Sequence, residues 1–254
     1  MELTYLDSNT WLIDNGVERI LLDPWLVGPL VFGNFPWFFK AERTVPRSIP
    51  EDIDLILLSQ GLPDHAHPET LKQLHRHIPV VASPNAAKVV KRLGYEEVTV
   101  LDHGETFTSN VSLSIKAVPG SPIGPMLVEN GYLIQNLKEG YTIYYEPHGY
   151  HSPDLKVSPP VNVAITPIVD VKIPLLGAII KGRKSALQLC QWLKPQVIIP
   201  TAAGGDVVFT GLLNALLQTE GSVSELCSLL KANKLSIKVV EPIPGTPFRL
   251  PLKV

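Results

Sequence analysis

The run from Asp54 to Leu58 is the feature of this chain that most constrains its fold. After Asp54 every residue of the run is leucine or isoleucine, so apolar and polar positions do not alternate. Such a run is typical of a strand buried on both faces, in a sheet that other layers cover. With 254 residues, 45% of them hydrophobic, the chain can bury such a sheet in one large α/β domain or two small ones.

Hydrophobic periodicity and turn residues divide the rest of the chain into short strands and helices. The expected elements are strands at 3–6, 10–14, 19–22 and 54–58, a helix at 68–77, a strand at 79–82, a helix at 83–93, strands at 98–101, 111–118, 126–135, 141–145 and 162–166, a helix at 182–193, a strand at 196–199, helices at 207–218 and 222–232, and a strand at 237–240. Strand-rich stretches thus alternate twice with strand–helix units. This order predicts an α/β fold, an αββα four-layer sandwich of two mixed β-sheets flanked by helices, in a single domain over residues 1–254.

Two segments, 26–40 and 173–180, are apolar, interrupted by glycine or proline, and without period. We expect them to be loops that either pack on each other or line a site for an apolar small molecule. The residues expected to line a substrate site are Trp25, Phe32, Phe35 and Trp37. The alternative is that these side chains cover a sheet end or the interface of a homo-oligomer. Because Lys40 and Arg43 flank the aromatic cluster, peripheral membrane contact is a further hypothesis.

Net charge, hydrophobicity and cysteine content predict the partners of the protein and its cellular compartment. A net charge of −2 gives no reason to expect a nucleic-acid partner. No stretch reaches the roughly 18 apolar residues of a membrane span, and the first residues lack the pattern of a signal peptide. Cys190 and Cys227 both fall in apolar, helix-like stretches and are expected to be reduced core residues. These features predict a cytoplasmic protein.

Candidate metal ligands follow the buried strand directly. Gln60, Asp64, His65, His67 and Glu69 lie within ten residues of one another. Neutral imidazole and carboxylate are ligands that zinc, iron and manganese accept. Adjacent Asp and His residues diverge in an extended chain, so they share a metal only in a tight turn or at a helix start. The alternative is a helix N-cap with exposed first-turn histidines.

At this point the sequence resembles a known family. Residues 20–26 (ILLDPWL), 55–59 (LILLS) and the pair Asp64-His65 resemble the opening of the metallo-β-lactamase superfamily, and most closely its branch similar to ascorbate-6-phosphate lactonases. That superfamily carries His-x-His-x-Asp-His after this strand. Aligned on Asp64-His65, its first two histidines fall on Gln60 and Leu62. The resemblance also implies that Asp23 lies near the centre.

Three later motifs resemble the family in order but differ at the ligand positions. Residues 117–122 resemble the strand end that supplies a third histidine, and Ser121 or Pro122 stands there. Residues 143–148 resemble the strand that delivers the metal-bridging aspartate; its counterpart is His148, with Glu146 as the alternative register. Residues 198–202 resemble a segment whose last residue is a histidine ligand, and here it is Ala202.

The resemblance therefore implies a degenerate centre with at most one metal ion, because the first site of the family has lost its histidines. Asp64, His65 and His148 are the expected ligands of one divalent metal (zinc, iron or manganese), and His151 either adds a ligand or orients His148. Two functions follow. One is a hydrolase of a hydrophobic small molecule or ester in which Asp64 orients or deprotonates a water molecule. The other is a non-catalytic binding member without metal, in which the same three residues form a polar cluster.

Overall fold

The computed structural model describes residues 1–33, 35–124, 126–174, 177–202 and 204–252, and the chain divides into two units. Unit 1 comprises Met1–Phe107, Gly204–Leu216 and Pro242–Leu250. Unit 2 comprises Thr108–Ala203, Leu217–Glu241 and Pro251–Val254. Among the described residues, no helix is long and apolar enough to cross a bilayer. Each unit is built on one seven-stranded mixed sheet.

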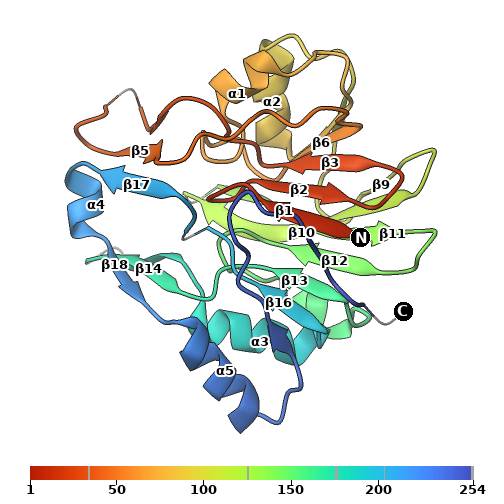
Figure 1. Cartoon of the computed structure of the whole chain (residues 1–254), viewed down its shortest axis with the longest axis vertical. Coiled ribbons are helices and arrows are strands. Elements are labelled where there is room, and N and C mark those ends of the chain that lie inside the picture. The colour runs from red at the N-terminus through yellow and green to blue at the C-terminus, as the bar shows by residue number, and fades with distance from the viewer. Residues whose placement is uncertain (34, 125, 175–176, 203, 253–254) are drawn as a thin grey trace. The chain divides into compact units, whose positions relative to one another are not determined.

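The sheet of unit 1 has the strand order β20-β1-β2-β3-β6-β7-β8. Strands β1, β2, β3 and β6 lie side by side in Figure 1. Neighbours β1, β2 and β3 pair antiparallel, whereas β3, β6, β7 and β8 run parallel. The strands of this unit are β1 (Glu2–Tyr5), β2 (Trp11–Asp14), β3 (Arg19–Leu22), β4 (Leu30–Val31), β5 (Lys40–Arg43), β6 (Leu55–Leu58), β7 (Val80–Ala82), β8 (Val98–Val100), β17 (Val207–Thr210) and β20 (Phe248–Arg249). All four residues of β6 are buried, as the apolar run predicts.

Three helices belong to unit 1: α1 (Pro68–Gln73), α2 (Pro84–Arg92) and α4 (Leu212–Leu216). Helix α2 begins where Ser83 accepts a hydrogen bond from the Ala86 backbone N–H, with proline in the first turn, which is favoured there because proline lacks an N–H. Its buried face packs into one hydrophobic cluster with Ile56 of β6 and Val80 of β7. Leu71 of α1 belongs to the same cluster, so α1 and α2 cover the parallel half of this sheet.

The sheet of unit 2 repeats the pattern, with the order β19-β16-β13-β12-β11-β10-β9. Here β10, β11 and β12 form the antiparallel part, and β12, β13, β16 and β19 the parallel part. The strands are β10 (Leu113–Ile123), β11 (Leu127–Asn136), β12 (Thr142–Tyr145), β13 (Val163–Ile165), β14 (Asp170–Ile173), β15 (Gly177–Ile180), β16 (Val197–Ile199), β18 (Gln218–Glu220) and β19 (Lys238–Val239), with β9 (Thr106–Thr108) at the boundary of the units.

Helices α3 (Arg183–Leu193) and α5 (Val223–Ala232), with the short 3-10 turn η1 (Pro153–Val157), complete unit 2. Leu189 and Cys190 of α3 and Leu226 of α5 share a hydrophobic cluster with Ala164 and Ile198 of the sheet. The predicted α/β fold with two large mixed sheets and flanking helices is therefore confirmed. The prediction of a single domain over residues 1–254 stays a prediction.

Cys227 corrects the expectation that both cysteines lie in the core. Cys190 is buried, and burial raises the pKa of its thiol to about 12. Cys227 is exposed. Helix α5 buries Leu226 and Leu230, which lie four residues apart on one face, so the residue after Leu226 points away from it.

The predicted helix at 207–218 is wrong. Residues Val207–Thr210 form β17, which pairs antiparallel with β5, and Gln218–Glu220 form β18, which pairs with β14. The β-branched and aromatic residues of β17 suit a strand. Gly211 follows with a φ of +102°, and a Cβ there would lie 2.6 Å from the carbonyl oxygen of Phe38. Only the short α4 between these strands is helical.

The two segments predicted to be loops also contain strands. Residues 30–31 form β4, which pairs with β5, and residues 177–180 form β15, which pairs with β14. Residues 34, 175 and 176 lie outside the described residues. The predicted helix at 68–77 is shorter as well, because Leu74 is extended and the Arg76 guanidinium donates to its carbonyl oxygen at 2.7 Å.

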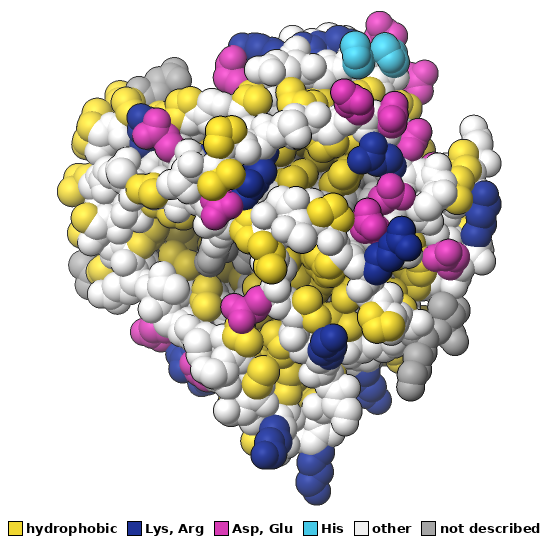
Figure 2. All heavy atoms as spheres, viewed as in Figure 1, with side chains coloured by type: hydrophobic (Ala, Val, Ile, Leu, Met, Phe, Trp, Pro, Cys, Tyr) yellow, Lys and Arg dark blue, Asp and Glu magenta, His cyan; other side chains and the backbone are white. Residues whose placement is uncertain are grey.

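The aromatic segment of unit 1 has a buried part and an exposed part. Trp25 and Phe39 lie in a small hydrophobic cluster, against which Phe32 packs. Phe35 and Trp37 are 55% and 65% exposed. Over β5, β17 and α4, hydrophobic side chains reach the surface (Figure 2). Full burial of Trp25 favours a packing role for this residue, and the substrate-lining role of the other three stays a prediction.

Candidate functional site

The predicted site residues follow strands of the parallel half of each sheet. In unit 1, Asp23 follows β3 and the segment Ser59–His67 follows β6, its parallel neighbour. In unit 2, Glu146 and His148 follow β12. Neighbouring parallel strands end at the same edge of a sheet, so the residues that follow them lie close together. Ligand-binding sites of α/β proteins are commonly found at this edge.

Asp23 connects the two strand ends of unit 1. Its side chain is fully buried, and its Oδ1 accepts a hydrogen bond from the backbone N–H of Ser59 at 2.7 Å. Its Oδ2 accepts from the Ser59 hydroxyl and lies 2.7 Å from Nδ1 of His65. A carboxylate behind the imidazole fixes the ring orientation and leaves Nε2 as the outward nitrogen. The structure thus places Asp23 directly behind His65.

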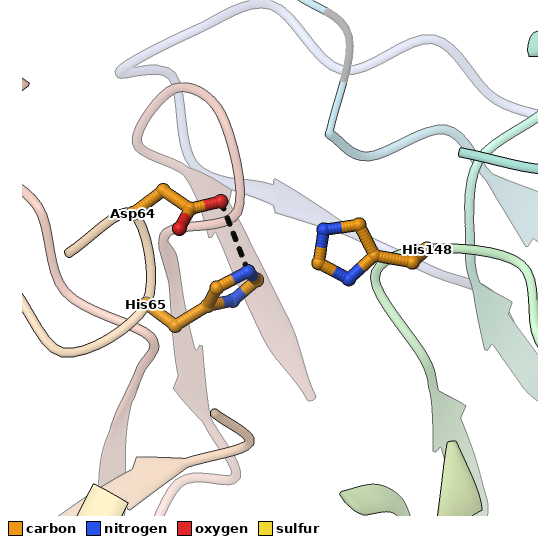
Figure 3. Close-up of side chains that lie close together, drawn as sticks. All are labelled: Asp64, His65 and His148. Carbon is orange, nitrogen blue, oxygen red and sulfur yellow. Dashed lines mark ion pairs between the residues drawn. The ribbon is translucent and has the colours of Figure 1, made fainter. Parts of the chain in front are cut away.

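Asp64 and His65 converge because the chain turns sharply between them and β6. The backbone N–H groups of His65 and Ala66 both donate to the carbonyl oxygen of Leu62, at 3.0 and 2.8 Å. Oδ2 of Asp64 then lies 3.1 Å from Nε2 of His65, the ion pair drawn in Figure 3. Gly61 allows this segment to approach α2 closely, because a Cβ there would lie 2.7 Å from Nδ2 and 3.0 Å from the backbone carbon of Asn85.

His65 is fully buried between two carboxylates. Burial opposes protonation of the ring, but the charges of Asp64 and Asp23 outweigh it and raise the pKa of His65 to about 10. Two donor atoms bonded to one zinc ion at about 2 Å each lie about 3 Å apart in a tetrahedral site. The Oδ2–Nε2 separation of 3.1 Å therefore fits two ligands of one ion. Asp64 and His65 could hold a metal without rearrangement of the turn.

In unit 2, Glu146 and Ser121 position His148. The buried carboxylate of Glu146 accepts backbone hydrogen bonds from His148 at 3.2 Å and Tyr150 at 2.7 Å, which shapes the loop after β12. The Ser121 hydroxyl lies 3.3 Å from Nδ1 of His148, so Nε2 is the nitrogen suited to a metal. Figure 3 also draws the His148 side chain at this loop. Glu146 thus organises the backbone around His148.

His67 and His151, both predicted as additional site residues, have other partners. His67 caps α1: its Nδ1 accepts from the Thr70 backbone N–H, and its Nε2 lies 3.3 Å from the carbonyl oxygen of Pro29. His151 lies 3.0 Å through Nδ1 from the Tyr144 hydroxyl, and burial lowers the pKa of its ring to about 3. Both histidines thus have contacts within their own units, and their role as additional site residues stays a prediction.

The four positions at which the resemblance implies family ligands are Gln60, Leu62, Ser121 and Ala202. Gln60 is buried, and Leu62 offers only its carbonyl oxygen, which the turn uses. Ser121 is buried beside His148, and Ala202 has a φ of +74° after β16. Ala203, beside it, lies outside the described residues.

Sequence reasoning missed two residues that contact the candidate ligands. The Asn9 side-chain amide lies 3.4 Å from Nε2 of His65, although Asn9 falls between the predicted strands at 3–6 and 10–14. Ser59 reads as the end of the strand, yet it binds Asp23 through both its N–H and its hydroxyl. Both contacts join segments far apart in sequence, and no local pattern indicates them.

The chain was compared with protein-family models and with curated protein sequences. A family model described as a beta-lactamase superfamily domain matches residues 2–202, which include all the candidate ligands. No curated protein sequence matches the chain.

Several solved structures share the fold at low sequence identity. A possible metal-dependent hydrolase from Veillonella parvula has a TM-score of 0.73 at 15% identity, with 98% of this chain and 99% of that one covered. An isothiocyanate hydrolase from Delia radicum gut bacteria has a TM-score of 0.68 at 14% identity, covering 98% and 99%. CmlA, a diiron β-hydroxylase from Streptomyces venezuelae, has a TM-score of 0.70 at 18% identity; 98% of this chain matches 54% of CmlA, so the chain spans about half its length.

Proposed function

The chain belongs to the beta-lactamase superfamily domain family, and from this premise we propose that it is a hydrolase that uses one divalent metal ion. The proposed ligands are Asp64 and His65 of unit 1 and His148 of unit 2, and zinc, iron and manganese all suit this donor set. The family resemblance supports the set, because these three residues occupy the ligand positions of its second metal. The closer assignment to the branch similar to ascorbate-6-phosphate lactonases stays a prediction.

The observation that carries the proposal is the Asp23–His65–Asp64 arrangement. Asp23 holds Nδ1 of His65 at 2.7 Å, and Asp64 lies 3.1 Å from Nε2. Carboxylate–histidine pairs of this kind orient metal-binding imidazoles and increase their basicity. Burial of the His65 ring between two buried or partly buried carboxylates carries a desolvation penalty. Metal binding by this cluster would explain why the protein keeps it despite that penalty.

The chemistry requires three contributions. When bound, a divalent ion supplies Lewis acidity and lowers the pKa of a coordinated water molecule. Asp64 would orient the attacking water and could accept its proton at a carboxylate oxygen. His65, held by Asp23, and His148, held by Ser121, keep their rings fixed. The expected substrate is a hydrophobic small molecule or ester, because Phe35 and Trp37 leave apolar surface exposed on unit 1.

A second candidate function is non-catalytic binding by a member of the fold that lacks metal. Leu62 and Ala202 at ligand positions favour it, since neither side chain can bind an ion. In that case Asp64, His65 and His148 would be a hydrogen-bonded polar cluster. Peripheral membrane contact and homo-oligomer formation likewise stay predictions.

Hydrolysis by the metal-loaded protein tests the catalytic proposal. We expect cleavage of 4-nitrophenyl esters or of benzyl isothiocyanate that a chelator abolishes and added metal restores. Asp64→Asn should lower kcat by about 10²- to 10⁴-fold, the usual contribution of a positioned base. Exposed Asp102→Asn serves as the control and should leave kcat unchanged. Hydrolysis that persists after chelation, or an unchanged kcat in Asp64→Asn, would contradict the proposal.

A further inference from the structure

Unit 2 contains a pocket of about 460 Å³ beside the start of α3, separate from the candidate metal ligands. Its walls include Gly149, Tyr150 and His151 from the loop after β12, and Lys181, Lys184 and Ser185 from the start of α3. Two of these residues are cations. Among the described residues that line the pocket, none is an aspartate or glutamate. The pocket is therefore positively charged.

The carboxylates around the pocket have other partners. Asp170 accepts a hydrogen bond from the backbone N–H of Gly182, and Glu220 and Glu225 pair with Arg183. Asp154 accepts from the Ser152 hydroxyl, and Glu146 accepts from the backbone N–H of Tyr150. In the part of the chain that the structure describes, no carboxylate lies within ion-pair distance of Lys181 or Lys184.

Contacts within unit 2 fix the shape of the pocket. The Lys181 backbone N–H donates to the carbonyl oxygen of His148 at 2.8 Å, and the Ser185 hydroxyl donates to that of Gly149. A Cβ on Gly149 would lie 1.5 Å from the carbonyl oxygen of Lys181, so only glycine permits this approach. The Lys181 ammonium lies 4.0 Å from the centroid of the Tyr150 ring, which holds it along the wall. The pocket is preformed, which lowers the entropic cost of binding.

His151 adds a polar atom to the pocket wall. Its Nε2 is buried and makes no hydrogen bond with any described residue. Its Nδ1 lies 3.0 Å from the hydroxyl of Tyr144, which is also buried. A buried polar atom without a partner is destabilising, and a bound ligand can supply the missing hydrogen bond.

The start of α3 favours the same ligand charge. This eleven-residue helix begins after Gly182, which provides no side-chain cap. The N–H groups of Arg183 and Ser185 in its first turn donate to the carbonyl oxygens of Ile168 and Gly182, so the helix attracts an anion only through its dipole, a small effect. The two lysines and the preformed shape of the pocket together point to a small anion.

We propose that this pocket binds a small oxyanion, the phosphate or carboxylate group of a metabolite, through Lys181 and Lys184. The site goes beyond the proposed hydrolase activity, because its residues all belong to unit 2 and none is a proposed metal ligand.

Calorimetric titration tests the site on protein that has been stripped of metal by a chelator and then dialysed. Inorganic phosphate and acetate are the two probes. We expect saturable one-site binding of at least one of them, and the tighter probe identifies the favoured group. The double variant K181A/K184A should bind it at least about tenfold more weakly, because it removes the charge-assisted hydrogen bonds of both lysines to the anion. Lys116→Ala removes an exposed lysine of β10 outside the pocket and is the matched control.

The outcomes are distinct. Weakened binding in the double variant with wild-type binding in the control supports the site. No saturable binding of either probe would overturn it, and so would equal weakening in both variants, which indicates non-specific attraction. Thermal melting of each variant verifies folding, which exposed lysines should not affect. Because the protein is free of metal, the result is independent of whether the hydrolase proposal holds.

Discussion

Asp23→Ala is expected to lower the free energy of unfolding by about 3–5 kcal/mol, the usual cost of removing one partner from a buried ion pair. The substitution leaves the Ser59 N–H and the His65 ring without the carboxylate that both contact within 2.7 Å. Since domains are stable by only about 5–15 kcal/mol, this is a large fraction of the total. Chemical denaturation measures it as a shift of the urea midpoint.

The variant Asp23→Asn separates the effects of shape and charge. An amide keeps the size of the side chain and one oxygen for Ser59, but it cannot stabilise a charged or metal-bound His65. We expect it to fold and to bind metal about 10- to 100-fold more weakly, the usual effect of losing the group behind a ligand. The exposed Asp102→Ala controls for loss of an acidic residue. A midpoint of Asp23→Ala equal to that of this control would show that Asp23 does not support the site.

Asp7→Ala is the second substitution with a large expected effect, again about 3–5 kcal/mol. The fully buried Asp7 carboxylate binds Arg43 at 3.2 Å, Arg47 at 2.9 Å and the backbone N–H of Asp206 at 2.8 Å. It thereby joins the turn after β1, the end of β5 and the segment that leads into β17, all within unit 1. Burial lowers the pKa of Arg43 to about 10, and the charge of Asp7 opposes this shift.

The neighbouring Asp206 provides a matched comparison inside the same cluster. Its side chain is 39% exposed and pairs only with Arg47 among the described arginines and lysines. Exposed ion pairs contribute about 0–1 kcal/mol, so Asp206→Ala should shift the urea midpoint far less than Asp7→Ala. Similar shifts for the two variants would show that burial of Asp7 does not decide the stability of this cluster.

The sequence predicts best where local chemistry decides the structure. The apolar run of β6 is buried throughout, as predicted. The tight turn required for Asp64 and His65 to converge is present, since Leu62 accepts both hydrogen bonds that close it. The resemblance to the family placed Asp23 near the centre, and in the structure it binds His65.

Prediction fails where a distant segment decides the structure. Residues 207–210 read as part of a helix, but they pair with β5, more than 160 residues earlier, and pairing partners leave no local signal. Gly211 is a similar case, because the distant carbonyl oxygen of Phe38 lies so close to it that a side chain would not fit. Asn9, close to His65, contributes to the site only through the folding of β1 and β2 beside β3.

Metal content tests the proposed single-ion site most directly. Elemental analysis of protein purified without chelator, with anomalous scattering from a crystal, gives the number and position of bound ions. We predict one transition metal per chain, bound by Asp64, His65 and His148 and lost in His148→Ala. Two ions per chain would contradict a degenerate centre, and a metal-free chain after incubation with zinc, iron and manganese would contradict metal-dependent hydrolysis.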